Sequence, residues 1–329
     1  MQISIVTLNY NGSTETLKLL KSLKNQTDPN FEIIVIDNAS EEADFTNLQD
    51  QLIHSFSLPT LNVDNPQGGT VLSPPQVKVV RNSDNLGFSG GNNIGIRHAL
   101  ENGSDWVVLL NNDIWVEKDF IEHLRAVLSP KNPLTSLGQM GVIGIPLIEG
   151  GKIAYYGQIQ WLKPTLKHAY QLTSPDGKAI EDPRQSRDLP AYQLYAIGGA
   201  VVIYKDVFEK IGLLDENYFL YFEDADFSVR VQKAGFDISI AENLSVHHYV
   251  SSSTKKLGSP LLLRYHYRNA LYFNLKNGPW YVKLAVWPWS VIIVIKQLGK
   301  LVINRDKEES KEILAGVTDF YKNKFGKIE

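Results

Sequence analysis

Two groups of acidic side chains stand where chemistry on a polar ligand would need them. Asp113 follows the apolar residues 106–110 and the amides Asn111 and Asn112, so its carboxylate emerges from the end of an expected buried strand. A divalent cation bound there would neutralise the charge that develops on a departing diphosphate. The same carboxylate would also serve to cap the helix expected near Phe120, and its position alone favours neither role.

The second acidic group lies in an aromatic frame at residues 218–230. Burying its three carboxylates, Glu223, Asp224 and Asp226, costs free energy unless they are solvated, paired with a cation or part of a functional site. Asp226 is expected to pair with Arg230 one helical turn later, which leaves Glu223 and Asp224 for function. A carboxylate in this position could take a proton from a hydroxyl group while that hydroxyl attacks a substrate.

A pair of histidines, His247 and His248, follows the apolar residues 238–241. Such a pair is usually structural. A neutral imidazole at His248 could instead complete a metal shell begun by Asp113, because imidazole and carboxylate ligands both bind divalent ions.

The elements that must position these side chains alternate along the first half of the chain. Apolar runs of strand length occupy residues 3–8, 31–36, 77–80 and 106–110, and apolar residues at helical spacing occur between and after them. Strands this apolar are covered on both faces, as in a parallel sheet flanked by helices. The sequence therefore predicts an α/β fold with a mostly parallel sheet, in which ligands bind beyond the carboxyl ends of the strands.

Each predicted strand ends in polar residues, at 7–11, 37–40, 81–82 and 111–113. One such end is most often a solvated turn, but four at the same edge of one sheet favour a polar ligand, and a nucleoside diphosphate suits them. The glycine-rich residues 85–93 would let the backbone approach this ligand before a helix begins, whose N-terminus attracts anions. Their glycine spacing and their place after the third strand differ from the dinucleotide fingerprint, which disfavours a dehydrogenase.

Composition narrows the choice of partner and compartment. The chain has 329 residues and no cysteine, which excludes disulfides and thiolate zinc sites. Residues 255–329 hold 14 Lys and Arg against 6 Asp and Glu, whereas residues 1–254 hold 19 against 30. An acidic body argues against nucleic acid as its ligand, and a basic tail would favour anionic lipid. The N-terminus runs directly into a strand and lacks a signal-peptide pattern, so we expect a cytoplasmic protein.

These residues, in this order, resemble glycosyltransferase family 2, the inverting enzymes of the GT-A fold, and within it the bacterial rhamnosyltransferase-like branch. The resemblance spans nearly the whole chain, and the ordered set of motifs is specific although each motif alone is weak. The matching segments are Thr7-Leu8-Asn9-Tyr10-Asn11, Val35-Ile36-Asp37-Asn38-Ala39-Ser40, residues 85–93, Leu110-Asn111-Asn112-Asp113, Gly198-Gly199-Ala200, Phe222-Glu223-Asp224-Ala225-Asp226, His248 with Ser251 and Ser253, Arg268-Asn269, and residues 316–326.

The resemblance implies a Rossmann-like GT-A domain and a role for each motif. Asp224 would be the general base, with Glu223 as the next candidate, and Gly198 and Gly199 would shape the acceptor side. A Mg²⁺ or Mn²⁺ ion would be held by Asp113, with His248 near it or near the diphosphate. The donor nucleotide would be bound by Thr7, Asn9, Asp37, Asn85, Gly87, Asn92 and Asn112.

Two features depart from the family pattern. The family's D-x-D position reads Asn111-Asn112-Asp113, so a single carboxylate remains and a low metal affinity is expected. Residues 57–76, which are polar and rich in proline and glycine, exceed what the branch usually carries, and no function is assigned to them.

We therefore expect transfer of a sugar from dTDP-rhamnose or a UDP-sugar to a hydroxyl of a saccharide or lipid-linked acceptor, in cell-surface polysaccharide or glycolipid assembly. Asp224 would deprotonate the hydroxyl in a single in-line displacement that inverts the anomeric centre. Two other functions remain open. A non-catalytic sugar-nucleotide-binding protein is disfavoured by the retention of Asp113, Glu223 and Asp224. A sugar nucleotidyltransferase is disfavoured because residues 7–12 contain no Lys or Arg.

We expect residues 1–255 to form the catalytic domain, with a nucleotide-binding half at about 1–115 and an acceptor half at about 116–255, followed by a helical segment at 256–329. In that segment residues 284–295 are uncharged but too short to span a bilayer, which takes about 20 residues. Nearby tryptophans and lysines predict a helix at 279–305 lying in the interface, peripheral on the cytoplasmic face of the inner membrane. A core helix on the sheet or a homodimer contact is the alternative.

Overall fold

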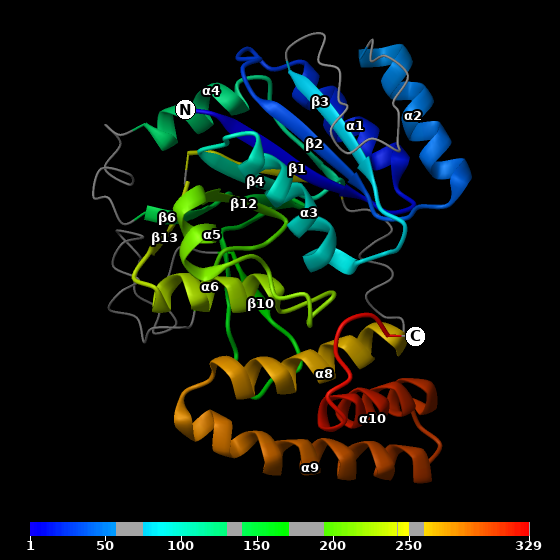
Figure 1. The fold of residues 1–329 in the computed structure, drawn as a ribbon. Coiled ribbons are helices and arrows are strands. Elements are labelled where there is room, and N and C mark those ends of the chain that lie inside the picture. The colour runs from blue at the N-terminus through cyan, green and yellow to red at the C-terminus, as the bar shows by residue number, and fades with distance from the viewer. Residues whose placement is uncertain (57–74, 130–139, 171–193, 242, 250–259, 329) are drawn as a thin grey trace.

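A computed structural model describes residues 1–56, 75–129, 140–170, 194–241, 243–249 and 260–328 (Figure 1). Most of the expected insertion at 57–76 lies outside these residues, as do Ser251 and Ser253. In Figure 1 a large sheet with helices on both faces forms the upper part of the molecule, and three long helices lie beneath it.

The large sheet has seven strands: β1 (Ile3–Asn9), β2 (Glu32–Asp37), β3 (Gln76–Arg81), β4 (Trp106–Leu110), β6 (Met140–Gly144), β12 (Ala200–Tyr204) and β13 (Asp237–Ile240). Their order is β13-β6-β12-β4-β1-β2-β3, and only β12 runs antiparallel to its neighbours. The four strands expected from apolar runs are β1 to β4. The predicted mostly parallel α/β fold is confirmed.

Alternate residues of the central strands contribute to two separate apolar cores, one on each face of the sheet. On β2, Ile33 and Val35 belong to one core and Ile34 and Ile36 to the other. This is the packing that continuous apolar strands predict. Helices α1 (Ser13–Lys24), α2 (Glu42–Phe56) and α4 (Phe120–Leu128) cover the first core, and α3 (Gly87–Glu101), α5 (Lys205–Ile211) and α6 (Glu223–Lys233) cover the second.

The glycine-rich stretch opens a helix, as expected, but residues 87–93 already belong to that helix, so they form no separate loop ahead of it. Helix α3 begins at Gly87, and its Gly91 and Gly95 face the sheet. A Cβ at Gly95 would lie 2.3 Å from Val6 Cγ1, and one at Gly91 would lie 2.9 Å from Leu8 Cδ2. Close packing of the helix against β1 therefore requires glycine at these positions.

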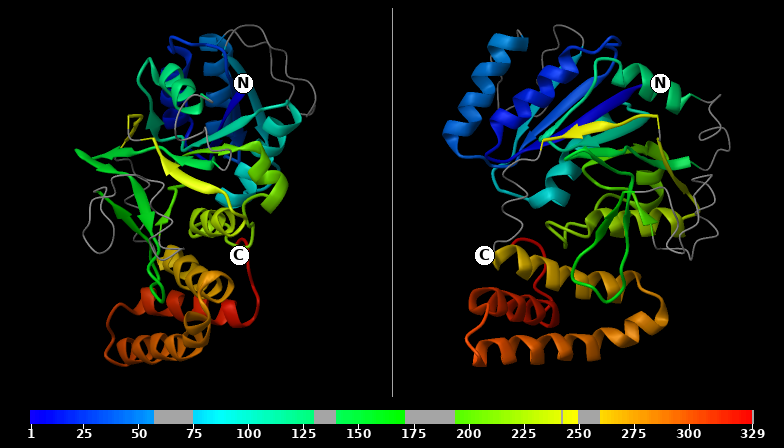
Figure 2. Two further views of the ribbon diagram at one scale, coloured as in Figure 1. Left: turned by 90° about the vertical axis from the view of Figure 1, so that its left-hand side faces the viewer. Right: turned by 180° about the vertical axis from the view of Figure 1, so that it is seen from behind.

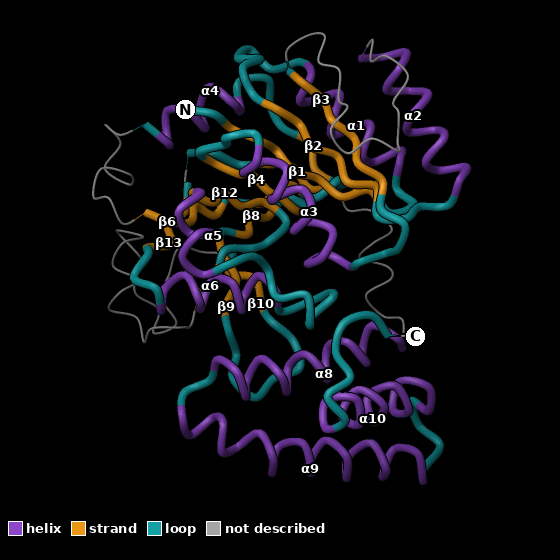
Figure 3. Tube along the Cα trace, in the orientation of Figure 1, coloured by secondary structure: helices purple, strands orange, loops and turns teal. Residues whose placement is uncertain are grey.

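Two small sheets stand beside the large one and carry residues of the site. One has the order β5-β14-β7-β8 and the other the order β10-β9-β11. Figure 3 shows β9 and β10 between the large sheet and the helices beneath it. The strands are β5 (Ile114–Trp115), β14 (Val246–His248), β7 (Leu147–Glu149), β8 (Lys152–Ala154), β9 (Tyr156–Gln158), β10 (Lys167–Ala169) and β11 (Leu194–Tyr195).

The three lower helices are α8 (Pro260–Asn277), α9 (Trp280–Val302) and α10 (Lys307–Tyr321). They pack on one another, and α8 also contacts α6 (Figure 2). Helix α9 is longer than the apolar run that predicted it. Its 23 residues include Pro288 and make it the one helix of the described residues that is long and apolar enough to cross a membrane. By length alone the expectation that this segment is too short to span is wrong.

Candidate active site

A cleft of about 710 Å³ lies between the carboxyl edge of the sheet, the two small sheets and α8. Six of the residues expected in the site line this cleft: Asp113, Gly198, Gly199, Glu223, Asp224 and His248. Asn111 lines it as well. Both acidic groups of the sequence, more than 100 residues apart, therefore meet in one cavity.

Asp224 is held at the cleft wall by two backbone amides. Gly198 N–H donates to its Oδ2 at 3.1 Å, and Ala225 N–H donates to its Oδ1 at 2.8 Å. Burial raises the pKa of the Asp224 carboxyl, and these two hydrogen bonds oppose that rise. The pKa of Glu223 is raised well above its ordinary value by burial and by the adjacent Asp224 charge. Asp224 is thus the carboxylate with donors that favour its ionised form.

The loop that presents these carboxylates is strained. Phe219, Tyr221 and Phe222 all have positive φ, between 61° and 76°, which bulky residues rarely adopt. Helix α8 holds this loop through Asn269, whose Nδ2 lies 2.9, 2.7 and 3.1 Å from the carbonyl oxygens of residues 218, 220 and 221. Arg268, which is buried, donates to the carbonyl of residue 218 at 3.2 Å. The Arg268-Asn269 motif therefore fixes the approach to α6.

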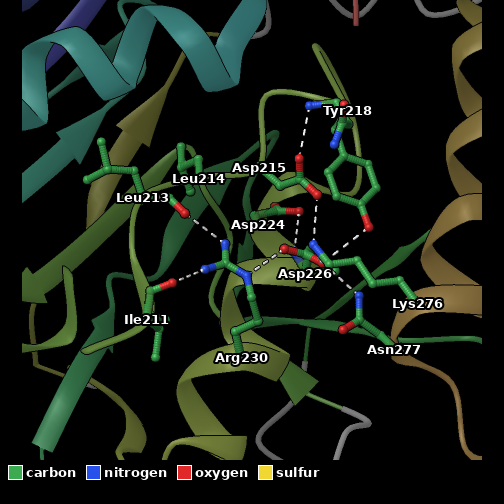
Figure 4. Close-up of polar contacts among 12 residues, drawn as sticks. Ile211, Leu213, Leu214, Asp215, Tyr218, Asp224, Asp226, Arg230, Lys276 and Asn277 are labelled. Carbon is green, nitrogen blue, oxygen red and sulfur yellow. Dashed lines mark hydrogen bonds and ion pairs between the residues drawn. The ribbon is translucent and has the colours of Figure 1, made fainter. Parts of the chain in front are cut away.

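Asp226 is a structural carboxylate (Figure 4). It is fully buried, and its oxygens lie 2.8 Å from Arg230 Nε, 2.7 Å from Lys276 Nζ and 2.7 Å from Asn277 Nδ2. Tyr218 OH contacts it at 3.2 Å. The predicted pair with Arg230 is confirmed, and the same carboxylate also ties α6 to the end of α8.

At the opposite side of the cleft, carboxylates and imidazoles alternate. His248 Nε2 lies 3.1 Å from Asp113 Oδ2, and His248 Nδ1 lies 3.3 Å from Glu149 Oε1. The other oxygen of Glu149 lies 3.8 Å from His168 Nδ1. The hydrogen bond that His248 donates to Asp113 raises the pKa of His248, and the neighbouring His168 lowers the pKa of Glu149. Asp113 and His248 are adjacent, as a shared metal role would require.

The glycine pair Gly198-Gly199, just before β12, allows close approach on both sides. A Cβ at Gly198 would lie 3.0 Å from the Cβ of Asp224. A Cβ at Gly199 would lie 3.0 Å from Asn111 Nδ2, and Gly199 O accepts a hydrogen bond from Asn111 N–H. Side chains here would push apart the two sides of the cleft.

The residues expected to bind the donor nucleotide lie outside the cleft lining, at the carboxyl ends of β1 to β4. Asn9 Nδ2 donates to Asp37 Oδ1 at 2.8 Å, and Asn112 Nδ2 donates to Thr16 Oγ1 at 3.1 Å. Thr7, Asn9, Asp37 and Asn92 are at most 3% exposed.

Most of these side chains are already hydrogen-bonded to neighbouring polar groups of the protein. Asn92 donates to the carbonyl of Phe88 in its own helix, and Asn85 accepts hydrogen bonds from Asn38 Nδ2 and Gly87 N–H. Gly87, at φ +70°, lets the strained loop approach, because a Cβ there would lie 2.3 Å from Phe219 O. In this structure these side chains build the edge of the sheet, and the half-buried Asn85 and Asn112 are the ones left partly open to a ligand.

Several cleft residues were not identified from the sequence. Glu149 and His168 sit on strands of three residues, too short to show a period, and Tyr195 sits on a strand of two. His266 stacks on Tyr221 with ring centroids 3.9 Å apart, and burial lowers its pKa to about 4. Of these residues only His266 lies close to a motif in the sequence, two residues before Arg268.

Comparison with known proteins agrees with this arrangement. Residues 4–153 match the family described as Glycosyl transferase family 2. The dTDP-rhamnosyl transferase RfbF of Shigella flexneri is 24% identical over 283 residues, which is 84% of this chain and 80% of that protein. The N-acetylglucosaminyl-diphospho-decaprenol L-rhamnosyltransferase of Mycobacterium tuberculosis is 22% identical over 306 residues, which is 87% and 88% of the two chains.

The fold has solved counterparts. The crystal structure of GalNAc-T7 with UDP, GalNAc and Mn²⁺ superimposes with a TM-score of 0.58 at 17% identity, covering 84% of this chain. This chain spans about half of that protein, 49% of its length, so the likeness is one of fold. Sequence, fold and cleft agree: residues 4–153 match glycosyltransferase family 2, and the chain is a nucleotide-sugar glycosyltransferase of the GT-A fold.

Proposed function

We propose that this enzyme transfers a hexose, with inversion, from a dTDP- or UDP-linked donor to a hydroxyl of a saccharide or lipid-linked acceptor in cell-surface glycan assembly. The observation that carries the proposal is the single cleft in which Asp224 lies on one side and Asp113 with His248 on the other. The names of the two rhamnosyltransferase relatives favour dTDP-rhamnose as the donor.

The chemistry follows from the two sides of the cleft. Asp224 accepts the acceptor's hydroxyl proton while the hydroxyl oxygen forms a bond to the anomeric carbon. The bond from that carbon to the donor diphosphate breaks on the opposite face, and the nucleoside diphosphate leaves with the electron pair. The raised pKa of Glu223 favours its protonated form, which limits the negative charge beside the base.

We propose that a Mn²⁺ or Mg²⁺ ion serves the leaving-group side, held by Asp113 and His248. Their oxygen and nitrogen donors suit such an ion, but the described residues contain no cluster of three or more His, Asp or Glu with metal-site geometry. The remaining ligands would be donor phosphates and water. When bound, the ion neutralises charge on the diphosphate. Among the described lining residues there is no Lys or Arg to do this.

A donor and metal screen tests this proposal. Thermal unfolding should be measured with UDP-, dTDP- and GDP-sugars, each with Mn²⁺ and with EDTA, because a ligand that binds only the native state raises the unfolding temperature. We expect a rise with dTDP-rhamnose or a UDP-sugar that EDTA abolishes, and transfer that returns with Mn²⁺ or Mg²⁺. Asp113→Ala should lose the metal response. Full transfer in excess chelator would contradict the metal role.

We further propose that residues 1–255 form the catalytic domain and that residues 256–329 dock it on the cytoplasmic face of a membrane. The carrying observation is the outer face of α9. Its inner positions, such as Val282, Val286 and Ile293, are buried against α8 and α10, whereas Trp287 is 67% exposed. Large exposed apolar residues recur along the outer face at Trp280, Tyr281, Leu284, Trp287, Val291, Ile292, Ile295, Leu298, Val302 and Ile303.

A stripe of this size marks an interaction surface. Because α9 packs along its length against α8 and α10, a position within the interface fits it better than a crossing, despite a helix length of about 35 Å. The exposed cations Lys283 and Lys296 lie within the stripe and would contact anionic headgroups, and tryptophans favour the headgroup level.

Vesicle flotation tests the membrane proposal. Deleting α9 would uncover the core that it shares with α8 and α10, so surface substitutions are the better perturbation. Leu284→Ser/Trp287→Ser/Ile295→Ser should abolish flotation with anionic vesicles, while the matched surface variant Ile153→Ser/Leu261→Ser floats like the wild type. Wild-type protein that stays at the bottom at low salt but elutes as a dimer would instead assign the stripe to a homodimer contact.

A further inference from the structure

A carboxylate with no role in the chemistry above stands between two of the histidines that line the cleft, His168 and His248. Glu149 is the last residue of β7, and a two-residue turn, Gly150-Gly151, connects it to β8. Both glycines have positive φ, 53° and 80°, as a tight hairpin turn of the primed type requires. The hairpin therefore fixes the backbone that carries Glu149 at the cleft wall.

The two oxygens of Glu149 contact different imidazoles. Oε1 lies 3.3 Å from Nδ1 of His248, and Oε2 lies 3.8 Å from Nδ1 of His168. The carboxylate is 24% exposed and His248 is 15% exposed, so water competes little for the shorter contact. Both histidines present Nδ1 to the same carboxylate, which leaves Nε2 of each ring directed elsewhere.

The hydrogen bond at one ring nitrogen decides what the other nitrogen can do. An ionised carboxylate only accepts hydrogen bonds, so Glu149 favours a proton on the Nδ1 that faces it. Nε2 of His248 donates to Asp113 when it is protonated, and it can bind a cation once that proton is lost. In His248 that Nε2 lies 3.1 Å from Asp113 Oδ2, on the leaving-group side of the cleft. Carboxylates in this place beside a metal-binding histidine fix its tautomer and its ring orientation.

We infer that Glu149 is a positioning residue that orients His248 Nε2 toward Asp113 through one oxygen and anchors His168 through the other. The inference rests on the proposed function for its consequence, because the oriented His248 then completes the cation site with Asp113. His168 lines the same cleft as Asp224.

The neighbouring histidine provides a matched control. His247 Nε2 lies 3.2 Å from Glu117 Oε1, and its ring stacks on Trp115 with centroids 3.8 Å apart. Neither His247 nor Glu117 lines the cleft. The Glu117–His247 pair is therefore the same kind of carboxylate–imidazole contact as the Glu149–His248 pair, but it lies outside the cleft.

The experiment compares Glu149→Ala, Glu149→Gln and Glu117→Ala by two measurements. The first is nitrogen-15 NMR of the seven histidine side chains without metal or donor, which reports which ring nitrogen carries the proton. We expect Glu149→Ala to change the His248 and His168 signals, Glu149→Gln to restore them in part because its amide oxygen still accepts, and Glu117→Ala to change His247 alone. Unchanged His248 and His168 signals in Glu149→Ala would overturn the inference.

The second measurement is Mn²⁺ affinity by calorimetry, with thermal unfolding to confirm that each variant is folded. Loss of such a carboxylate typically costs about 10- to 100-fold in metal affinity. We expect that loss in Glu149→Ala and wild-type affinity in Glu117→Ala, and equal affinities would overturn the link to the cation site. If the wild type itself bound no Mn²⁺ while the NMR signals responded to Glu149→Ala, the metal role would fail and the positioning role would stand.

Discussion

Asn269 on α8 offers the sharpest test of how the fold presents its carboxylates. Its side-chain amide lies within 3.1 Å of three carbonyl oxygens in the loop at 218–221, and the residue is fully buried. Asn269→Ala removes the donor and leaves those carbonyls without it. Phe219 and Tyr221 of this loop and the adjoining Phe222 have positive φ, so we expect the loop to relax once the amide is gone.

The magnitude follows from the contacts. An amide has two N–H groups, each hydrogen bond contributes about 0.5–1.5 kcal/mol, and a buried carbonyl left unpaired costs about 1–3 kcal/mol, so we expect a loss of about 2–4 kcal/mol in unfolding free energy. The unfolding entropy of a chain of 329 residues, at about 2.1 cal/mol/K per residue, is about 0.7 kcal/mol/K. The unfolding temperature should therefore fall by about 3–6 °C.

The activity should fall by more than this stability loss explains, because Asp224 follows the loop directly. Misplacing a reacting group by about 1 Å can cost about 100-fold in rate. The assay is steady-state transfer at a temperature where circular dichroism shows the variant to be folded.

The control for Asn269 is Asn274→Ala on the same helix. Asn274 is also buried, and its amide bonds the carbonyl of Ala270 and the backbone N–H of Leu162, away from the loop. It should lose similar stability and keep kcat within about threefold of the wild type. Equal rates in the two variants would refute the view that Asn269 positions the base.

Three further outcomes follow from burial and packing. The pKa of Glu223 is raised in the folded state, so the stability that this group contributes is present at low pH and is lost as the pH rises. The unfolding temperature of Glu223→Gln should therefore rise relative to that of the wild type between about pH 4 and pH 8. A difference that stays constant over this range would contradict the expectation. Gly95→Ala should destabilise by about 1–3 kcal/mol through its clash with β1, whereas Gly299→Ala on α9, with open space around it, should not, as chemical denaturation can show. Asp226→Ala should cost about 3–5 kcal/mol in the same assay because it leaves two cations facing a vacated site, and a loss below about 1 kcal/mol would refute its structural role.

The sequence was most informative where burial imposes a pattern. Apolar runs such as 31–36 located β1 to β4, because strands covered on both faces leave little room for polar residues. The antiparallel insertion of β12 between β4 and β6 could not be predicted, since an apolar run carries no strand direction. The glycines of α3 were misplaced because a helix packed tightly on a sheet and a ligand-binding loop favour the same residue.

The candidate site was predicted where motifs carried it. Asp113, Asp224 and His248 were chosen from order and chemistry, and the structure brings them into one cleft, although their roles remain predictions. Glu149 and His168 could not be found, because strands of three residues show no period and their contacts join segments 19 residues apart. Helix α9 exceeded its apolar run because helical spacing tolerates lysines on its exposed and flanking positions.

The most direct test of the account is the transfer rate of Asp224→Asn with the donor and metal identified by thermal unfolding. Asparagine keeps the shape of the side chain and cannot take the hydroxyl proton. We predict a loss of about 10²- to 10⁴-fold in kcat with donor affinity close to that of the wild type. Turnover near the wild-type rate would contradict the central claim that Asp224 is the general base, and Glu223 would be tested next.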